Sequence, residues 1–468
     1  MEGPVIQRVL VANRGEVASR LFRFFREREI ETVSAFLEAE VDQPWVGEAD
    51  YDAYLNGKTV ATSYLDVMRV VGAAADAGCD AIHPGYCFLA ERVDLITVAA
   101  NANLAVIGAD PRALARVVDR FEVRRRAREL GLPVVPGTEP LGEEDDGVEA
   151  GAGFGFPLFV KAVGGGVVRR VERVEALPAA VAAVRAAARL VAGDARVYLE
   201  RALPRLRSIG VNVIGDRHGT MVHVGCTDGS LQFPGVPTGV AVGSGDLGVP
   251  RAPGHDFKSW VEELGAVVEP ALAERLGNES VALMRDIGWV GVGKVRWAVT
   301  PDGGHYLLGV SGRLTAGYSL VETAYNVDLI DVQYRTWLGE PLGWGQRDVP
   351  ANRHGVELRV VPFDRNDPYA SIEGTIERLE LPDQEDVMAV TGTAEGQPVT
   401  PETDPLLVKI TISGPTRHAA LVRARHALEA LVIEGVPTNR EVLLELLADE
   451  RVWRGEHDVA TLGAHLGV

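Results

Sequence analysis

Short apolar runs alternate with amphipathic stretches along the first hundred residues of the chain. Strand-like runs rich in β-branched residues occur at 5–11, 32–36, 81–82 and 105–108. Stretches with helical apolar spacing separate them, at 16–29 and 66–77. Because strands that alternate with helices form a parallel sheet covered on both faces, the pattern predicts an N-terminal α/β domain.

The pattern changes at 133–147, where prolines and glycines are followed by an acidic stretch. Beyond it we predict a strand at 158–162, a glycine loop, an alanine-rich helix at 177–192 and a strand at 196–200. Alanine has the best helix propensity, and the apolar positions of this helix repeat every three to four residues. We therefore place a domain boundary at 133–147.

Composition narrows the function classes. The formal net charge of −19 argues against a general nucleic-acid or anionic-membrane partner. Cys79, Cys87 and Cys226 have no metal-ligand spacing, which favours reduced thiols. A signal-peptide pattern and an apolar run of membrane-spanning length are both absent from the sequence. We therefore expect a cytoplasmic protein.

One basic cluster stands out against this acidic background. It lies in a helix-forming stretch and comprises Arg120, Arg124, Arg125, Arg126 and Arg128. The favoured interpretation is a solvated helix face rather than a phosphate-binding patch.

Several motifs carry a family resemblance. Residues 81–91 read Ala-Ile-His-Pro-Gly-Tyr-Cys-Phe-Leu-Ala-Glu, and residues 12–18 read Ala-Asn-Arg-Gly-Glu-Val-Ala. Further landmarks follow in order at 355–359, 404–409 and 433–439. Together these segments resemble biotin carboxylase, the ATP-grasp component of biotin-dependent carboxylases, which uses MgATP and bicarbonate to carboxylate biotin.

The resemblance implies an ATP-grasp fold, α/β overall and α+β in its C-terminal part. Residues 1–132 would form the N-terminal Rossmann-like domain with linking helices, and 133–204 the small B domain, or lid. Residues 205–468 would form a large C-terminal domain built on an antiparallel sheet.

The resemblance also assigns nucleotide contacts, which make ATP a candidate ligand. Lys161 and Arg120 stand at two nucleotide-binding lysine positions, and Val167 and Val168 follow a shortened glycine loop. Since β-branched residues resist positive φ, we expect this lid not to close in the family manner. The remaining candidate contacts are Gly164, Gly165, Gly166, Glu200, Arg201, Leu203 and Gln232.

Most positions that the family uses for chemistry carry other residues. The metal-ligand positions hold Arg296, Gly309 and Ser311. The positions of two further glutamates, one of them the catalytic base, hold Gly210 and Gly317, and the bicarbonate lysine position holds Pro237. Arg313 and Arg359 keep their family identity. A metal supplies several kcal/mol of charge stabilisation and a positioned base about 10²–10⁴-fold in rate, so we predict no Mg²⁺ site and no biotin carboxylation.

The favoured hypothesis is therefore a non-catalytic subunit, homo- or hetero-oligomeric, of a biotin-dependent carboxylase assembly. Its partners would be an active biotin carboxylase, the biotin carboxyl carrier protein or the carboxyltransferase. The sequence has no biotinyl Met-Lys-Met motif and no carboxyltransferase segment, so we expect no covalently bound biotin and separate carrier and transferase chains.

Three alternatives remain. Arg296 could bind a phosphate directly, which would make the chain a metal-independent nucleotide sensor. A repurposed ATP-dependent ligase would use Lys161 and the arginines as an anion-lined cleft, with His218 or His223 as its base, and an active ligase would still use ATP and bicarbonate for a biotin-type carboxylation. The last alternative is a paralogue without a dedicated role.

Overall fold

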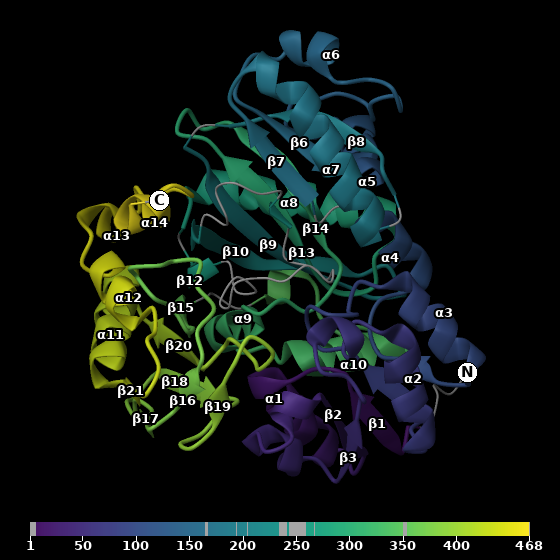
Figure 1. The fold of residues 1–468 in the computed structure, drawn as a ribbon, viewed down its shortest axis with the longest axis vertical. Coiled ribbons are helices and arrows are strands. Elements are labelled where there is room, and N and C mark those ends of the chain that lie inside the picture. The colour runs from purple at the N-terminus through teal and green to yellow at the C-terminus, as the bar shows by residue number, and fades with distance from the viewer. Residues whose placement is uncertain are drawn as a thin grey trace.

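The computed structural model describes residues 6–163, 167–192, 194–203, 205–233, 241–242, 259–265, 267–349 and 353–467. Gly164, Gly165, Gly166 and Pro237, named above, lie outside these residues. Figure 1 shows an N-terminal sheet at the bottom, a small sheet with its helices at the top, and a large sheet between them. None of the described helices has both the length and the apolar character needed to cross a membrane.

The N-terminal sheet is parallel, with strand order β3-β2-β1-β4-β5. Its strands are β1 (Arg8–Val11), β2 (Glu31–Phe36), β3 (Tyr51–Tyr54), β4 (Ala81–His83) and β5 (Ala105–Val106). Its helices are α1 (Gly15–Arg26), α2 (Val67–Asp76) and α3 (Val93–Asn101). Val9 and Val11 pack into one hydrophobic cluster and Leu10 into another, so β1 is apolar because both of its faces are covered.

Two helices, α4 (Pro111–Val118) and α5 (Arg120–Glu129), lead from this sheet to the lid. Asp119 caps α5, since its Oδ1 accepts hydrogen bonds from the backbone N–H groups of Phe121 (2.9 Å) and Glu122 (3.0 Å). The cap fixes where the helix begins and therefore places Arg120 at its first turn.

The lid is an antiparallel sheet with strand order β11-β7-β6-β8. It contains β6 (Leu158–Ala162), β7 (Val167–Val171), β8 (Val197–Arg201), β11 (Ala241–Val242), α6 (Val148–Ala152) and α7 (Leu177–Ala192). Leu177, Val181, Val184 and Ala188 of α7 pack into the lid core. The predicted strand at 158–162 and helix at 177–192 are confirmed, and the last strand lies one residue later than predicted.

The large sheet is antiparallel, with strand order β14-β13-β9-β10-β12-β15-β20-β18. These strands are β9 (Arg207–Gly215), β10 (Met221–Gln232), β12 (Ser259–Leu264), β13 (Gly291–Val299), β14 (His305–Ser311), β15 (His354–Val360), β18 (Val387–Thr391) and β20 (Val408–Gly414). Two small strand pairs accompany it: β16 (Gly374–Thr375) with β19 (Pro398–Val399), and β17 (Arg378–Glu380) with β21 (Val432–Glu434). The predicted combination of parallel N-terminal sheet, lid and large antiparallel sheet is confirmed.

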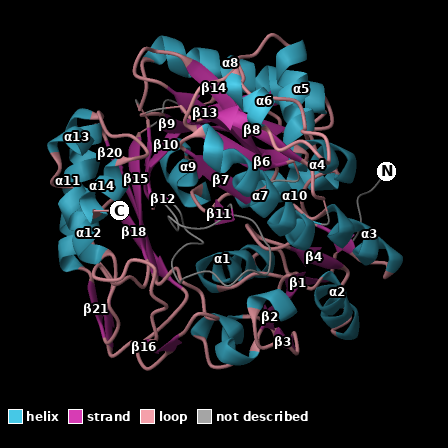
Figure 2. Cartoon of the chain, turned by 45° about the horizontal axis from the view of Figure 1, so that its top comes forward, coloured by secondary structure: helices cyan, strands magenta, loops and turns pink. Residues whose placement is uncertain are grey.

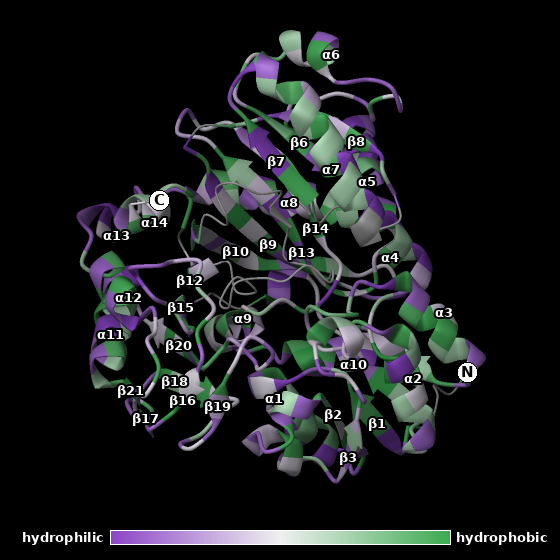
Figure 3. Ribbon diagram, viewed as in Figure 1, coloured by the Kyte–Doolittle hydropathy of each residue, from purple (hydrophilic) through white to green (hydrophobic). Residues whose placement is uncertain are grey.

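Helices cover this sheet on both faces. The helices of this part of the chain are α8 (Pro270–Ile287), α9 (Tyr318–Tyr325), α10 (Leu329–Leu338), α11 (Arg417–Ala430), α12 (Arg440–Leu446), α13 (Glu450–Arg454) and α14 (Thr461–Leu466), of which α12 packs on α11. Figure 2 shows α11 and α12 stacked beside β15 and β20, and every residue of β20 is buried. In Figure 3 the peripheral helices carry both hydrophilic and hydrophobic residues, as helices with one packed face do.

Three of the motifs that carry the resemblance meet around one buried carboxylate. Glu16 accepts hydrogen bonds from the hydroxyl groups of Tyr86 (2.9 Å) and Tyr318 (2.8 Å). The fully buried Lys409 completes the group, with its Nζ 2.7 Å from a Glu16 oxygen. Segments 12–18, 81–91 and 404–409 are therefore one structural unit that joins the N-terminal domain to β20.

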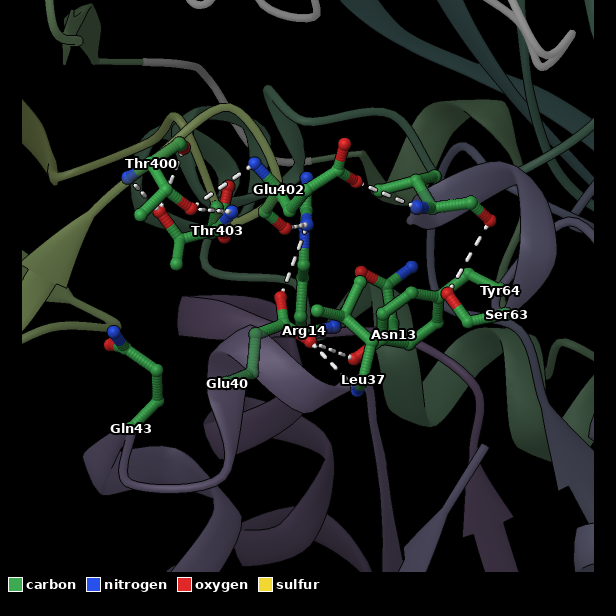
Figure 4. A network of polar contacts seen from close by, with 12 residues as sticks. Asn13, Arg14, Leu37, Glu40, Gln43, Ser63, Tyr64, Thr400, Glu402 and Thr403 are labelled. Carbon is green, nitrogen blue, oxygen red and sulfur yellow. Dashed lines mark hydrogen bonds and ion pairs between the residues drawn. The ribbon is translucent and has the colours of Figure 1, made fainter. Parts of the chain in front are cut away.

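A second polar network joins the same two parts of the chain, and Figure 4 shows it at close range. Arg14 donates to the backbone carbonyl of Glu402 (2.7 Å) and pairs with the buried Glu40 (3.1 Å). Glu40 also accepts a hydrogen bond from the Tyr64 hydroxyl (2.8 Å). A charged pair of this kind tolerates burial only with such added hydrogen bonds, so the network fixes the docking geometry.

Candidate functional site

Two of the predicted nucleotide contacts pair with each other across the lid sheet. Lys161 on β6 forms an ion pair with Glu200 on β8. The other carboxylate oxygen of Glu200 lies 2.9 Å from Nη1 of Arg124 on α5. Glu200 therefore bridges two cations, and the structure places Arg201 on the exposed side of the same strand end.

The basic cluster is not a solvated helix face throughout, because Arg124 is buried. This arginine is only 4% exposed, and its Nε and Nη2 have no hydrogen-bond partner among the described residues. Burial lowers the pKa of Arg124, and the Glu200 charge opposes that effect. Arg125 and Arg128 are exposed, as a solvated helix face requires, and Arg125, Arg126 and Arg128 each form an ion pair. Helical spacing alone did not show that one of the arginines faces the lid.

Arg296 on β13 lies opposite Gly309 on β14 in the strand register. A Cβ placed on Gly309 would lie 3.7 Å from the Nη2 of Arg296, so the guanidinium group is directed towards this glycine. The Nε of Arg296 is buried and has no hydrogen-bond partner among the described residues. Burial, together with the charges of Arg120 and Arg313, lowers the pKa of Arg296 to about 10.

Arg313 lies beside this group and is held by Glu91, a residue of the 81–91 motif. The Arg313 Nε donates to Glu91 at 3.1 Å, and the backbone N–H of Gly312 donates to the other Glu91 oxygen at 2.7 Å. The structure therefore brings together three arginines that sequence reasoning had placed in separate motifs.

The side chains at the implied metal position do not fit Mg²⁺. This ion prefers anionic oxygen ligands in an octahedral shell. Arg296 supplies a positive charge, Gly309 supplies no side chain, and Ser311 supplies a neutral hydroxyl. Within the described residues, no group of three or more His, Cys, Asp and Glu side chains is arranged to hold a metal ion. The expected lack of a Mg²⁺ site stays a prediction.

A buried network of four charged residues lies next to the arginines. Lys294, two residues before Arg296 on β13, forms an ion pair with Glu262 on β12. The other oxygen of Glu262 is 2.6 Å from Nη2 of Arg359, which is also 2.6 Å from Glu357. The two cations and two carboxylates balance, as buried ionic groups must to avoid a large desolvation cost.

The environment of Glu262 keeps its carboxylate ionised. Burial raises its pKa, but Lys294 and Arg359 outweigh that effect and lower the pKa to about 2. For Arg359, Glu357 and Glu262 outweigh burial and raise the pKa. Arg359 also donates to the backbone carbonyl of Ser259 at 2.8 Å. The predicted site residue Arg359 is therefore fully engaged within the protein.

Lys294 and Glu262 fill the space next to two glycines at positions where the resemblance implies glutamates. A Cβ on Gly210 would lie 2.4 Å from Cε of Lys294, and a Cβ on Gly317 would lie 2.6 Å from Oε2 of Glu262. Sequence reasoning missed both charged residues. Lys294 and Arg296 are the two charged residues of a strand that is otherwise apolar, and this pair of charges at alternate positions was the available signal.

The two candidate histidines lie away from Arg296, and the candidate Gln232 bonds within its own strand. His223 packs against Gly277 of α8, whereas Lys294 and Arg296 are on the opposite face of the sheet from Val295, which packs with α8. His218 is on the β9–β10 turn and contacts the backbone carbonyl of Gly339 at 2.9 Å. The Gln232 side chain, at the end of β10, donates to the backbone carbonyl of Gly229 at 2.5 Å. The structure therefore brings neither His218 nor His223 to the arginine group.

Comparison with known proteins gives matches along nearly the whole chain. Residues 5–114 match the family model for the N-terminal domain of biotin carboxylase, and residues 357–464 match the model for its C-terminal domain. Between them, residues 119–344 match the ATP-binding domain of the carbamoyl-phosphate synthase L chain.

Full-length relatives and solved structures agree with these models. Biotin carboxylase 2 of Bacillus subtilis is 31% identical over 465 residues, which cover 98% of this chain and 99% of the relative. Biotin carboxylase of Halalkalibacterium halodurans is 32% identical over 470 residues, with 99% of each chain covered. The dimeric biotin carboxylase domain of Hydrogenobacter thermophilus 2-oxoglutarate carboxylase, solved with MgADP, ADP and bicarbonate, superposes with a TM-score of 0.88 at 27% identity, covering 99% of this chain and 98% of that domain.

Proposed function

The chain belongs to the biotin carboxylase family, and on that premise we propose that it is a member that does not carboxylate biotin. It acts as a non-catalytic subunit of a biotin-dependent carboxylase assembly. The observation that carries the proposal is the buried network of Lys294, Glu262, Arg359 and Glu357. It fills the space beside Gly317, where the family has its base, with residues that are neutralised by one another.

The charges explain why this network is a poor substitute for the family chemistry. A general base works best when its pKa lies near the operating pH, and the pKa of Glu262 is lowered to about 2. Arg359 uses its donors on Glu357, Glu262 and Ser259, so a bound anion would have to displace protein contacts. At about 1.4 kcal/mol per tenfold in rate, losing both the base and the metal carboxylates costs many decades.

The catalytic part is tested by ADP formation from MgATP and bicarbonate, with and without free biotin. An active biotin carboxylase serves as the positive control. We expect no ADP above background and no stimulation by biotin. Biotin-stimulated ADP formation would overturn the proposal, and loss of that turnover in Glu262→Gln would then identify Glu262 as a relocated base.

The assembly part is tested separately by size-exclusion chromatography with light scattering. The chain is run alone, with an active biotin carboxylase, and with a biotinylated carrier protein. The dimeric state of the Hydrogenobacter thermophilus domain supports an oligomer here as well. We expect a stable complex with at least one partner, and a monomer that binds neither would refute this part.

The alternative of a metal-independent nucleotide sensor is favoured by one specific observation, the group of Arg120, Arg296 and Arg313. The sensor function is compatible with a non-catalytic subunit, because a subunit that binds a nucleotide without turnover can respond to the concentration of that nucleotide.

A further inference from the structure

Three arginines from three separate elements lie close together where α5 meets the β13–β14 edge of the large sheet. Arg120 is the first residue of α5, Arg296 is on β13, and Arg313 follows β14. α5 packs against β14, and β14 pairs with β13, so the three elements are direct neighbours. The charges of Arg120 and Arg313 both disfavour protonation of Arg296, as expected for guanidinium groups that are close together.

The group carries excess positive charge. Glu91 is the carboxylate that the structure places beside it, and this residue is held by Arg313 and by the backbone N–H of Gly312. Among the described residues, neither Arg120 nor Arg296 forms an ion pair. Three cations and one carboxylate leave a net charge of about two units.

Of the three arginines, Arg296 is the one with a buried hydrogen-bond donor that has no partner among the described residues. Its Nε is buried and has no partner within the described part of the chain, and a buried polar group without a partner costs free energy. Opposite it, Gly309 leaves the space in front of the guanidinium group free of side-chain atoms. A planar guanidinium group presents paired donors that match two oxygens of a phosphate.

We propose that Arg120, Arg296 and Arg313 form a site for the phosphate chain of a nucleotide that is bound without a divalent cation. The inference rests on the proposed function, because it assigns a ligand to a site that does not catalyse. Arg296 takes the place of the metal, and supplies both the positive charge and the directional donors that a metal ion would otherwise bring to the phosphates.

A phosphate chain fits this site better than other anions. Its several negative charges match the net positive charge of the group, whereas a monocarboxylate would leave a cation unpaired. Mg²⁺ would oppose binding, because it neutralises the phosphates and repels Arg296. The site therefore reverses the usual dependence of nucleotide binding on the metal.

The test is isothermal titration calorimetry on the full chain with ATP, inorganic triphosphate and adenosine, each in EDTA and again with excess Mg²⁺. We expect ATP to bind in EDTA and to bind more weakly with Mg²⁺. Equal affinity for triphosphate would mean that phosphate alone is recognised, and tighter binding of ATP would mean that adenine adds contacts. Either result supports the site.

Two variants test whether Arg296 contacts the phosphate chain. Arg296→Gln should weaken metal-free binding by about tenfold or more, since it removes charge-assisted hydrogen bonds. Arg128→Gln is the control: it removes one positive charge, as Arg296→Gln does, but Arg128 is on the surface of α5 and pairs with Glu139. Arg128→Gln should bind as the unchanged chain does.

A second readout separates lost binding from lost folding. Arg296→Gln removes an unpaired buried cation, so the melting temperature of the ligand-free protein should stay the same or rise. Failure of ATP and triphosphate to bind in EDTA, a requirement for Mg²⁺, or unchanged binding by Arg296→Gln would each overturn the inference. Biotin-stimulated turnover would refute the proposed function instead, so the two failures are distinguishable.

Discussion

Arg296 on β13 points at Gly309 on β14, with Nη2 3.7 Å from the position of a Cβ on that glycine. These are the two positions at which the family resemblance expects metal-binding glutamates. Gly309 has φ of +149°, a conformation that residues with side chains rarely adopt. The two positions therefore differ from a metal site in both charge and backbone geometry, and restoring one glutamate alone is not expected to rebuild it.

Glu200→Gln should strongly destabilise the lid. The substitution keeps the shape of the side chain but leaves Arg124 buried without a charged partner. Breaking a buried pair from one side costs about 3–5 kcal/mol, measured as the free energy of unfolding in urea. Glu139→Gln is the control, because its pair with Arg128 is exposed and should contribute less than about 1 kcal/mol. Similar losses in both variants would contradict the burial of the Arg124 pair.

Gly317→Ala should disturb the buried network. The new Cβ would lie 2.6 Å from Oε2 of Glu262, which must move away from Arg359 or Lys294. The backbone itself is not strained, since φ at Gly317 is −77°. Overpacking of this kind costs about 1–3 kcal/mol. Gly345→Ala is the control for thermal denaturation and should change stability little, since its φ is −121° and its Cβ would make only an ordinary contact with Asp348, at 3.8 Å.

The Glu262 carboxylate should make stability depend on acid pH. Its folded pKa is about 2 and its ordinary value is 4.5, so its contribution is present above pH 4.5 and is lost as the pH falls towards 2. The contribution is on the order of 3 kcal/mol. The difference in unfolding free energy between the unchanged chain and Glu262→Gln should therefore shrink over this interval. A difference that stays constant with pH would show that Glu262 is not held ionised.

Asp404 should show the opposite dependence. Burial raises its pKa to about 6 from an ordinary value of 3.8, and Glu40 and Glu16 add to that effect while Arg14 opposes it. Its stabilising contribution is present below pH 3.8 and is lost as the pH rises through 6. Asp404→Asn should therefore gain stability relative to the unchanged chain between pH 4 and 7, by on the order of 3 kcal/mol.

The control for this pH series is Asp364→Asn. Asp364 accepts a hydrogen bond from the backbone N–H two residues later (2.8 Å), as Asp404 does from Leu406 (3.0 Å). Thermal denaturation of both variants is measured across the pH range. The comparison separates the effect of the buried Asp404 charge from the effect of losing the hydrogen bond that both aspartates accept from the backbone. A relative gain in the Asp364 variant as large as that in the Asp404 variant would rule out burial as the cause.

The sequence alone determined the fold and the residue types at the site. Apolar periodicity located β6 and α7, because local propensity and one buried face are sufficient to specify such elements. The ordered motifs identified the family, and the residue types at 296, 309 and 317 led to the prediction that its chemistry is lost.

Only the tertiary structure decided which charges meet. Lys294 and Glu262 come from different strands, and the sheet brings them together beside Gly317. Arg124 differs from its helix neighbours only because the lid covers it. The state of a buried charge depends on partners and desolvation, and both are set by strand register and domain docking rather than by spacing along the chain.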